Sequence, residues 1–244
     1  MSVVRVSYPH DPVTLVPARL RTSRVAGVAA AVREQLNLLP HRLDLELLQL
    51  VSRACALTVN GLPLRIVWDL GSTVKDDAGQ PAYGSSEAVA DATVLIRLNV
   101  QIVGDEHIAR STAVHELGHA VFDAPSWFSG AHDSPSRAPR QVFASSGSQK
   151  SRSRDWSEWR ANEFMGSLLA PRQLLHGELL KLAPLHRVPL VPGRFSNEPP
   201  VALNCPELHS LVDALGETFG LSWSFIAVRL AKYDLVARVR DSRS

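Results

Sequence analysis

The pentapeptide His-Glu-Leu-Gly-His at residues 115–119 constrains this chain more than any other part of its sequence. It lies inside residues 105–122, which start with two acidic residues, contain no proline and carry apolar residues at helical spacing. These features predict one helix of about five turns. Because residues four apart share a face of a helix, the two imidazoles can point at a single ion. Zinc requires this arrangement of two of its ligands.

Glu116 lies about a hundred degrees further round the predicted helix than His115. It cannot easily supply a third ligand from there, but it can reach a water molecule at the metal and act as a general base. Gly118 would weaken the helix by about 1 kcal/mol relative to alanine, which indicates that a substrate or a neighbouring backbone approaches closely. The alternative is that His115 and His119 are two surface histidines on an ordinary amphipathic helix.

A zinc site of this kind needs a third protein ligand and an open position for water. Candidates lie in residues 155–170, where the sequence has a helical pattern that Pro171 ends. On the residues alone, three carboxylates in this segment rank almost equally, namely Asp155, Glu158 and Glu163. The alternative for Glu158 is a helix carboxylate that faces solvent.

The sequence of this segment, together with the pentapeptide, also resembles that of a known protein family. After the pentapeptide the chain has the pattern Glu158-x-x-Ala161-Asn162-x-Phe164-x-x-x-Leu168-Leu169-x-Pro171. The two motifs together resemble the ImmA/IrrE-type zinc metallopeptidases, and the resemblance extends over about residues 64–236. The chain departs from the family pattern at Met165, where alanine is usual, and at Arg160, where an acidic residue is common. The connection between the two helices is also longer than the family usually shows.

The resemblance implies that His115, His119 and Glu158 bind Zn²⁺, with Glu163 as the second choice for the third ligand, and that Glu116 is the catalytic base. It implies a zincin-like α+β domain in which a small mixed sheet packs on the active-site helix. It also implies a protein substrate, namely a helix-turn-helix transcriptional repressor whose cleavage releases gene expression. Since affinity order and metal availability both matter, Mn²⁺ and Fe²⁺ stay open as native metals.

Composition and charge are those of an ordinary globular protein. Of the 244 residues, 45% are hydrophobic and 20% are charged, and the formal net charge is +2. This balance argues against nucleic-acid binding by the whole surface, while local basic patches stay open. Cys55 and Cys205 give neither a disulfide framework nor a thiolate zinc site, which fits a reducing compartment. The N-terminus lacks an apolar signal core and no long apolar run occurs, so we expect a cytoplasmic protein without membrane spans.

The predicted elements follow one another as helices, then strands, then helices, which argues for an α+β fold rather than a parallel α/β sheet. We expect residues 1–60 to form a helical segment that packs on a metallopeptidase core of residues 61–182. Within the first segment, residues 1–21 should be irregular, and helices should cover residues 24–36 and 43–58.

Extended segments precede the pentapeptide. Residues 63–71 have a strand pattern that ends in a glycine turn, and a short extended piece surrounds residues 83–84. Residues 92–100 are the clearest strand, because Val94, Ile96, Leu98 and Val100 alternate with residues of the other face. This strand is either an edge strand that pairs with the extended substrate beside the active-site helix, or a plain core strand.

Residues 124–154 connect the two ligand helices and contain nine serines, three prolines and five basic residues. A structureless connection of this length inside a compact domain is usually a functional lid or is disordered. We therefore expect either a flexible flap near the cleft that offers basic contacts to a partner, or a disordered insertion. His132 and Asp133 lie here and are poor ligand candidates.

Residues 183–206 are rich in proline and include His186 and Arg194, either of which could stabilise an oxyanion. Residues 207–244 should form a helix pair shaped like a helix-turn-helix, with Ser222 as the N-cap of its second helix and a basic end. Packing of this pair on the peptidase is the first interpretation, and direct DNA binding is the second.

Three functions are compatible with these patterns. The first is a zinc-dependent metallo-endopeptidase that hydrolyses a peptide bond in a regulatory protein. The second is a DNA- or repressor-binding regulator that retains the zinc fold without peptidolysis, and the third is a zinc hydrolase of another substrate class. Glu116 argues against the second function, because binding zinc alone does not require a base at that position. The sequence leaves the oligomeric state open.

Overall fold

The computed structural model describes residues 2–38, 41–44, 46, 55–76, 78–89, 92–129, 140–144, 152–194 and 197–238. The chain divides into two compact units, residues 1–169 and residues 170–244. The first unit contains the pentapeptide and the candidate third ligands, and each unit is described by itself.

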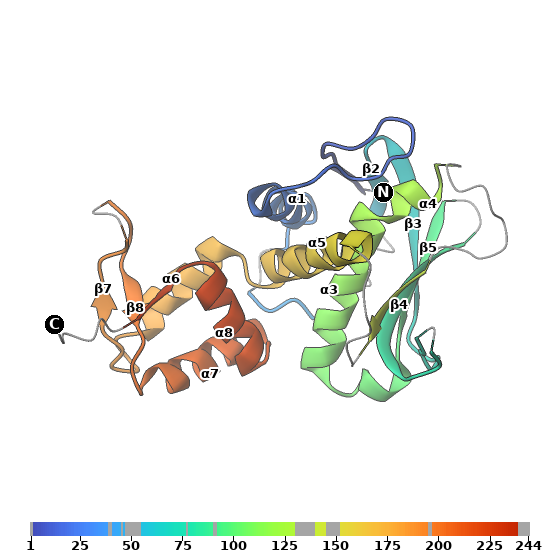
Figure 1. The fold of residues 1–244 in the computed structure, drawn as a ribbon. Helices are drawn as coiled ribbons and strands as arrows, with labels where there is room; N and C mark the ends of the chain where they lie inside the picture. The colour runs from blue at the N-terminus through green and yellow to red at the C-terminus, as the bar shows by residue number, and fades with distance from the viewer. Residues whose placement is uncertain are drawn as a thin grey trace. The chain divides into compact units, whose positions relative to one another are not determined.

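One mixed sheet with the strand order β1-β2-β3-β5-β4-β6 forms the frame of the first unit (Figure 1). β1 runs parallel to β2 and β3 runs parallel to β5, whereas the other neighbouring strands are antiparallel. This mixed sheet packed with helices confirms the predicted α+β class. The strands are β1 (Ser2–Val6), β2 (Cys55–Val59), β3 (Leu62–Asp69), β4 (Ala82–Val89), β5 (Thr93–Leu98) and β6 (Arg140–Ala144).

The predicted strand at residues 92–100 is β5, and it lies inside the sheet between β3 and β4. Val94, Ile96 and Leu98 are fully buried, as their alternation predicted. Val100, which the same alternation placed on this face, lies beyond the end of the strand and is 46% exposed. Both edges of β5 already pair with neighbouring strands, so its role as a substrate-binding edge strand is wrong and the core-strand interpretation holds. The outer edge of β4 is likewise paired, because β6 runs along it.

Two predictions for the N-terminal segment are wrong. The stretch predicted to be irregular contains β1, and the end of the helix predicted for residues 43–58 is instead β2. β2 and β3 are joined by Asn60 and Gly61, with φ of 51° and 85°. Positive φ at both positions is typical of the tight turn of a β-hairpin, which asparagine and glycine favour. Most of the remainder of that predicted helix lies outside the described residues.

α3 (Glu106–Phe122) is the helix predicted for residues 105–122. The Asp105 side chain accepts hydrogen bonds from the backbone N–H groups of His107 and Ile108, both at 3.1 Å, and caps the start of the helix. One side of α3 lies on β4 and β5, and α5 (Arg152–Leu169) packs against it as well (Figure 1). α1 (Thr22–Gln35) in turn packs on α5 and β1. The pentapeptide helix therefore lies within the core of its unit.

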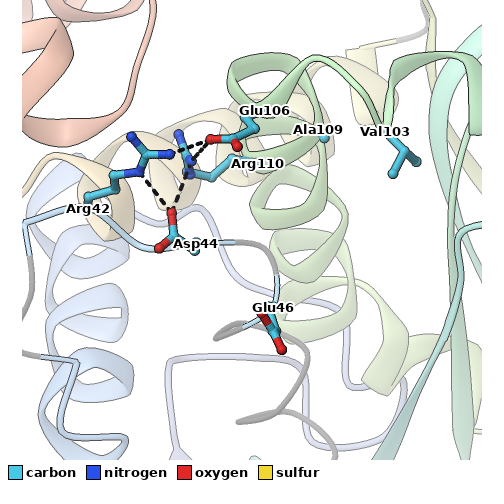
Figure 2. A pocket seen from close by; sticks show the side chains of 7 residues that line it. All are labelled: Arg42, Asp44, Glu46, Val103, Glu106, Ala109 and Arg110. Carbon is cyan, nitrogen blue, oxygen red and sulfur yellow. Dashed lines mark hydrogen bonds and ion pairs between the residues drawn. The ribbon is translucent and has the colours of Figure 1, made fainter.

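A pocket of about 350 Å³ lies at the N-terminal end of α3 (Figure 2). Arg42 and Arg110 line it with Asp44 and Glu106, and each arginine contacts both carboxylates. The Arg110 side chain is almost fully buried, whereas both carboxylates are exposed. Glu46 also lines the pocket but lies apart from the ion pairs (Figure 2). Because the positive charges are matched by carboxylates, we interpret this cluster as an anchor for the start of α3.

Among its described residues, the insertion predicted to be structureless contains a short helix, a strand and the start of α5. α4 (Ala124–Trp127) directly follows α3, and β6 adds an antiparallel strand to β4. The prediction that this insertion is wholly disordered or wholly flexible is therefore wrong for these elements. Residues 130–139 and 145–151, which include His132 and Asp133, lie outside the described residues.

The second unit combines helices with a small sheet in the order β7-β8-β9. α6, which the sequence placed with the peptidase core, belongs to this unit. The residues predicted to be a proline-rich loop include β7 and β8. The elements are α6 (Arg172–Leu182), β7 (Leu190–Val191), β8 (Val201–Leu203), α7 (Leu208–Phe219), α8 (Trp223–Lys232) and β9 (Val236–Ala237).

α7 and α8 are inclined to each other by 103°. Gly220 ends α7 with φ 62° and ψ 41°, and the Ser222 hydroxyl caps α8 by accepting a hydrogen bond from the backbone N–H of Phe225. This angle and this short glycine-containing turn are those of a helix-turn-helix, as predicted. Among the described residues, no single helix is long and apolar enough to cross a membrane, and only α7 and α8 taken as a bent pair meet that criterion.

Candidate metal centre

The structure brings His115, His119 and Glu158 together at the crossing of α3 and α5. The two Nε2 atoms are 3.1 Å apart, and the Glu158 carboxylate oxygens lie 3.5 Å from Nε2 of His115 and 3.8 Å from Nε2 of His119. Atoms that bind one zinc ion tetrahedrally, each about 2.0–2.2 Å from it, lie roughly 3.3–3.6 Å from one another. The three side chains could therefore hold a metal ion, and their two imidazoles and one carboxylate are a donor set that zinc accepts.

Burial separates this cluster from an ordinary surface arrangement. His115, Glu116 and His119 are fully buried, and Glu158 is only 7% exposed. The alternatives of surface histidines and of a solvent-facing Glu158 are therefore wrong. Because ionised carboxylates are strongly unfavourable in a protein interior without a compensating charge, a cation between these side chains would stabilise Glu116 and Glu158.

The structure describes the side chain of only one of the other two candidates for the third ligand, Glu163. Glu163 is on α5 and is also buried, but among the described side chains the group of converging ligand atoms contains only His115, His119 and Glu158. Asp155 lies in the first part of α5, and its side chain is outside the described ones. The geometry therefore favours Glu158, which the family resemblance also selects.

Glu116 lies next to the ligands and beneath β4. A Cβ atom at Gly84 of β4 would come within 3.2 Å of the Glu116 Cγ and within 2.6 Å of a Thr112 methyl group. Only glycine lets β4 approach α3 this closely at the level of the base. Glu116 is therefore packed against β4, and it is outside the group of converging ligand atoms.

Gly118 marks the closest approach of α3 to α5. A Cβ atom built on it would lie 2.9 Å from Cα of Ala161 and 3.3 Å from the Ala161 carbonyl oxygen. Of the two explanations offered by the sequence, the approach of a neighbouring backbone is therefore correct. This crossing sets the distance between the helix of the histidines and the helix of Glu158.

Replacing Gly118 by alanine is expected to destabilise the protein by about 1–3 kcal/mol, although alanine favours a helix, because the two backbones must separate. Denaturant unfolding of the zinc-free protein measures the change. Gly27→Ala on α1 is the matched control, since nothing lies within 4 Å of its added methyl group. That control should be stabilised by up to about 1 kcal/mol. Equal stabilisation of both variants would contradict the close crossing.

Asp123 completes the site and was not singled out from the sequence. Its Oδ2 is 2.7 Å from Nδ1 of His119, and it also accepts a 2.6 Å hydrogen bond from the Ser157 hydroxyl. Arg160 Nη2 donates to the other carboxylate oxygen at 2.5 Å. A sequence signal existed, because Asp123 is four residues after His119 and therefore lies on the same side of α3.

Burial lowers the pKa of His115 and so favours the neutral imidazole that binds metal, although hydrogen bonding to Glu158 acts in the opposite direction. For Asp123, burial acts to raise the pKa, but the hydrogen bond and charge of His119 and the charge of Arg160 outweigh it, so the pKa falls below its usual range. Asp123 is therefore a carboxylate at neutral pH, and it can only accept the hydrogen bond from His119.

The two candidates for oxyanion stabilisation belong to the second unit. His186 Nδ1 is 3.1 Å from the Ser210 hydroxyl within that unit. Arg194 precedes the short gap in the described residues at 195–196. Neither residue is assigned a role.

Comparison with protein-family models, with curated proteins and with solved structures found no match for this chain.

Proposed function

We propose that this chain is a zinc-dependent metallo-endopeptidase with a zincin-like fold that hydrolyses a peptide bond in a regulatory protein. The observation that carries the proposal is the convergence of His115, His119 and Glu158, with Glu116 buried beside them on the same helix as the two histidines. The substrate class rests on the family resemblance, which points to a helix-turn-helix transcriptional repressor.

His115 and His119 would hold a zinc ion through two neutral imidazoles and Glu158 through one carboxylate. When bound there, zinc would lower the pKa of a water molecule toward about 7 and polarise the scissile carbonyl. Glu116 accepts the proton of the attacking water and passes it to the leaving amine. Both proton transfers take place on a buried side chain, where charges interact more strongly than in water.

The structure holds the site in a closed arrangement, since both histidines and Glu116 are fully buried. An extended substrate also cannot pair with β5, whose two edges are occupied. Substrate entry therefore requires residues around the cluster to move.

A DNA-binding regulator is the second candidate, because α7 and α8 have the angle of a helix-turn-helix. The exposed side of α8, however, presents Trp223 and Val228. Arg229 of the same helix is buried and donates a 2.6 Å hydrogen bond to the Tyr233 hydroxyl. This arrangement provides few cations for phosphate contacts along α8, so DNA binding ranks below peptidolysis.

The test starts from the purified protein loaded with one equivalent of Zn²⁺ and mixed with soluble proteins of the organism that encodes it. Mass spectrometry of newly formed N-termini should find cleavage at a defined bond in one or a few regulatory proteins. Chelation should abolish these termini and added zinc should restore them.

Stoichiometric zinc binding without any new terminus would contradict peptidolysis. Hydrolysis of a small ester or amide under the same conditions would then favour the third function, a zinc hydrolase of another class. DNA affinity that survives chelation and falls steeply with salt would favour the regulator.

A further inference from the structure

Asp123 has no place in the proton transfers of the proposed function, yet it is buried against a metal-ligand candidate. Its carboxylate accepts the hydrogen bond of His119 Nδ1–H at 2.7 Å. With the proton on Nδ1, the lone pair of His119 lies on Nε2, which is the atom that faces His115 at 3.1 Å and Glu158 at 3.8 Å. The carboxylate thus selects the tautomer that can bind a metal from this side.

Asp123 is itself held by α5, the helix of Glu158. Ser157 and Arg160 each donate to a different oxygen of the carboxylate, at 2.6 Å and 2.5 Å. These two residues are three apart on α5, so both lie on the side of the helix that faces Asp123. The carboxylate therefore links His119 on α3 to the helix that carries the third ligand.

Charge compensation accounts for the burial of Arg160 beside Asp123. The Arg160 side chain is 11% exposed and that of Asp123 is 8% exposed, so each charge has little solvent around it. The guanidinium offsets the carboxylate, whereas an acidic side chain at position 160 would repel it. Arg160 and Asp123 thus form one buried unit together with His119.

We propose that Asp123, held by Ser157 and Arg160, is a positioning residue that sets the tautomer and orientation of His119 and thereby the zinc affinity of the site. The inference rests on the metal site of the proposed function, but it does not require peptidase activity. Partners of this kind behind a metal-binding histidine typically contribute 10- to 100-fold in metal affinity.

The test measures zinc affinity of the full chain by competition with a chromogenic chelator. Asp123→Asn should bind zinc about 10- to 100-fold more weakly than the wild type. The absorption spectrum of the Co²⁺-loaded variant should change as well, because the orientation of one ligand changes. Asp105→Asn, at the other end of α3, is the matched control and should keep both the affinity and the spectrum, since asparagine also caps helices.

Ser157→Ala supplies a second measurement if Asp123→Asn does not fold. It removes the 2.6 Å hydrogen bond to the carboxylate together with the 3.3 Å contact between the Ser157 hydroxyl and His119 Nδ1, and it should weaken zinc binding by roughly 3- to 10-fold. Zinc affinity equal to that of the wild type in a folded variant, accompanied only by lower stability of the metal-free form, would overturn the positioning role. If the wild type binds no zinc at all, the metal site of the proposed function fails, which is a distinguishable result.

Discussion

Glu116→Gln is expected to bind one zinc ion as tightly as the wild type and to lose about 10²- to 10⁴-fold of kcat/KM for peptide hydrolysis. Glutamine has nearly the same size and fits the space beneath β4, but it cannot accept the proton of the attacking water. Because Glu116 stands outside the group of converging ligand atoms, metal binding should not depend on it. Zinc stoichiometry and steady-state kinetics on the same preparations measure both quantities.

Glu106→Gln is the matched control, since it makes the same substitution on the same helix at an exposed residue. It should retain the zinc content and activity of the wild type, with a stability change of about 1 kcal/mol at most. More than a tenth of the wild-type activity in Glu116→Gln would show that another group accepts the proton. Loss of zinc from Glu116→Gln would instead make Glu116 a ligand.

The second large effect concerns the ligands themselves. His119→Ala and Glu158→Ala should each lower zinc affinity by more than about 100-fold. Losing a hydrogen-bond partner of a ligand lowers the affinity by up to roughly 100-fold, and losing the ligand itself costs more because a bond to the metal disappears. Elemental analysis after dialysis should find little zinc in either variant, and peptide hydrolysis should fall with it. Thermal unfolding with and without zinc should show that only the wild type is stabilised by the metal.

Two further variants make this test selective. His107→Ala removes an exposed histidine from the same helix and should leave zinc content unchanged. Glu163→Gln removes the charge of the alternative third ligand and should also retain zinc. The assignment of Glu158 fails if Glu158→Ala keeps its zinc while Glu163→Gln loses it.

Helices around the site could be predicted from the sequence because their signals are local. The cap at Asp105, the apolar spacing of the following turns and the stop at Pro171 all act within a few residues. The same locality places His115 and His119 on one face of α3. The alternation in β5 is equally local, and it correctly predicted the burial of Val94, Ile96 and Leu98.

Strand pairing could not be predicted from local sequence signals in the same way. β1 pairs with β2 across more than fifty residues, as in the register Ser2↔Cys55. Because β1 lies at the end of the strand order, its ladder hydrogen bonds depend on this distant partner. The Asn60–Gly61 turn is a local signal for the hairpin of β2 and β3. The prediction of a helix over residues 43–58 did not take this signal into account. Whether β5 is an edge or an inner strand depends on where β3 and β4 lie, and alternation within one strand does not contain that information.

Site chemistry shows the same division. The sequence by itself determined that His115, Glu116 and His119 lie together, because one helical turn connects them. On the residues alone Glu158 and Glu163 were almost equal candidates, and the tertiary structure separates them, since the choice depends on how α5 crosses α3 at Gly118 and Ala161. The partnership of Asp123 with Arg160 was likewise decided by that crossing, because a buried charge is stabilised by whichever opposite charge the packing brings within reach.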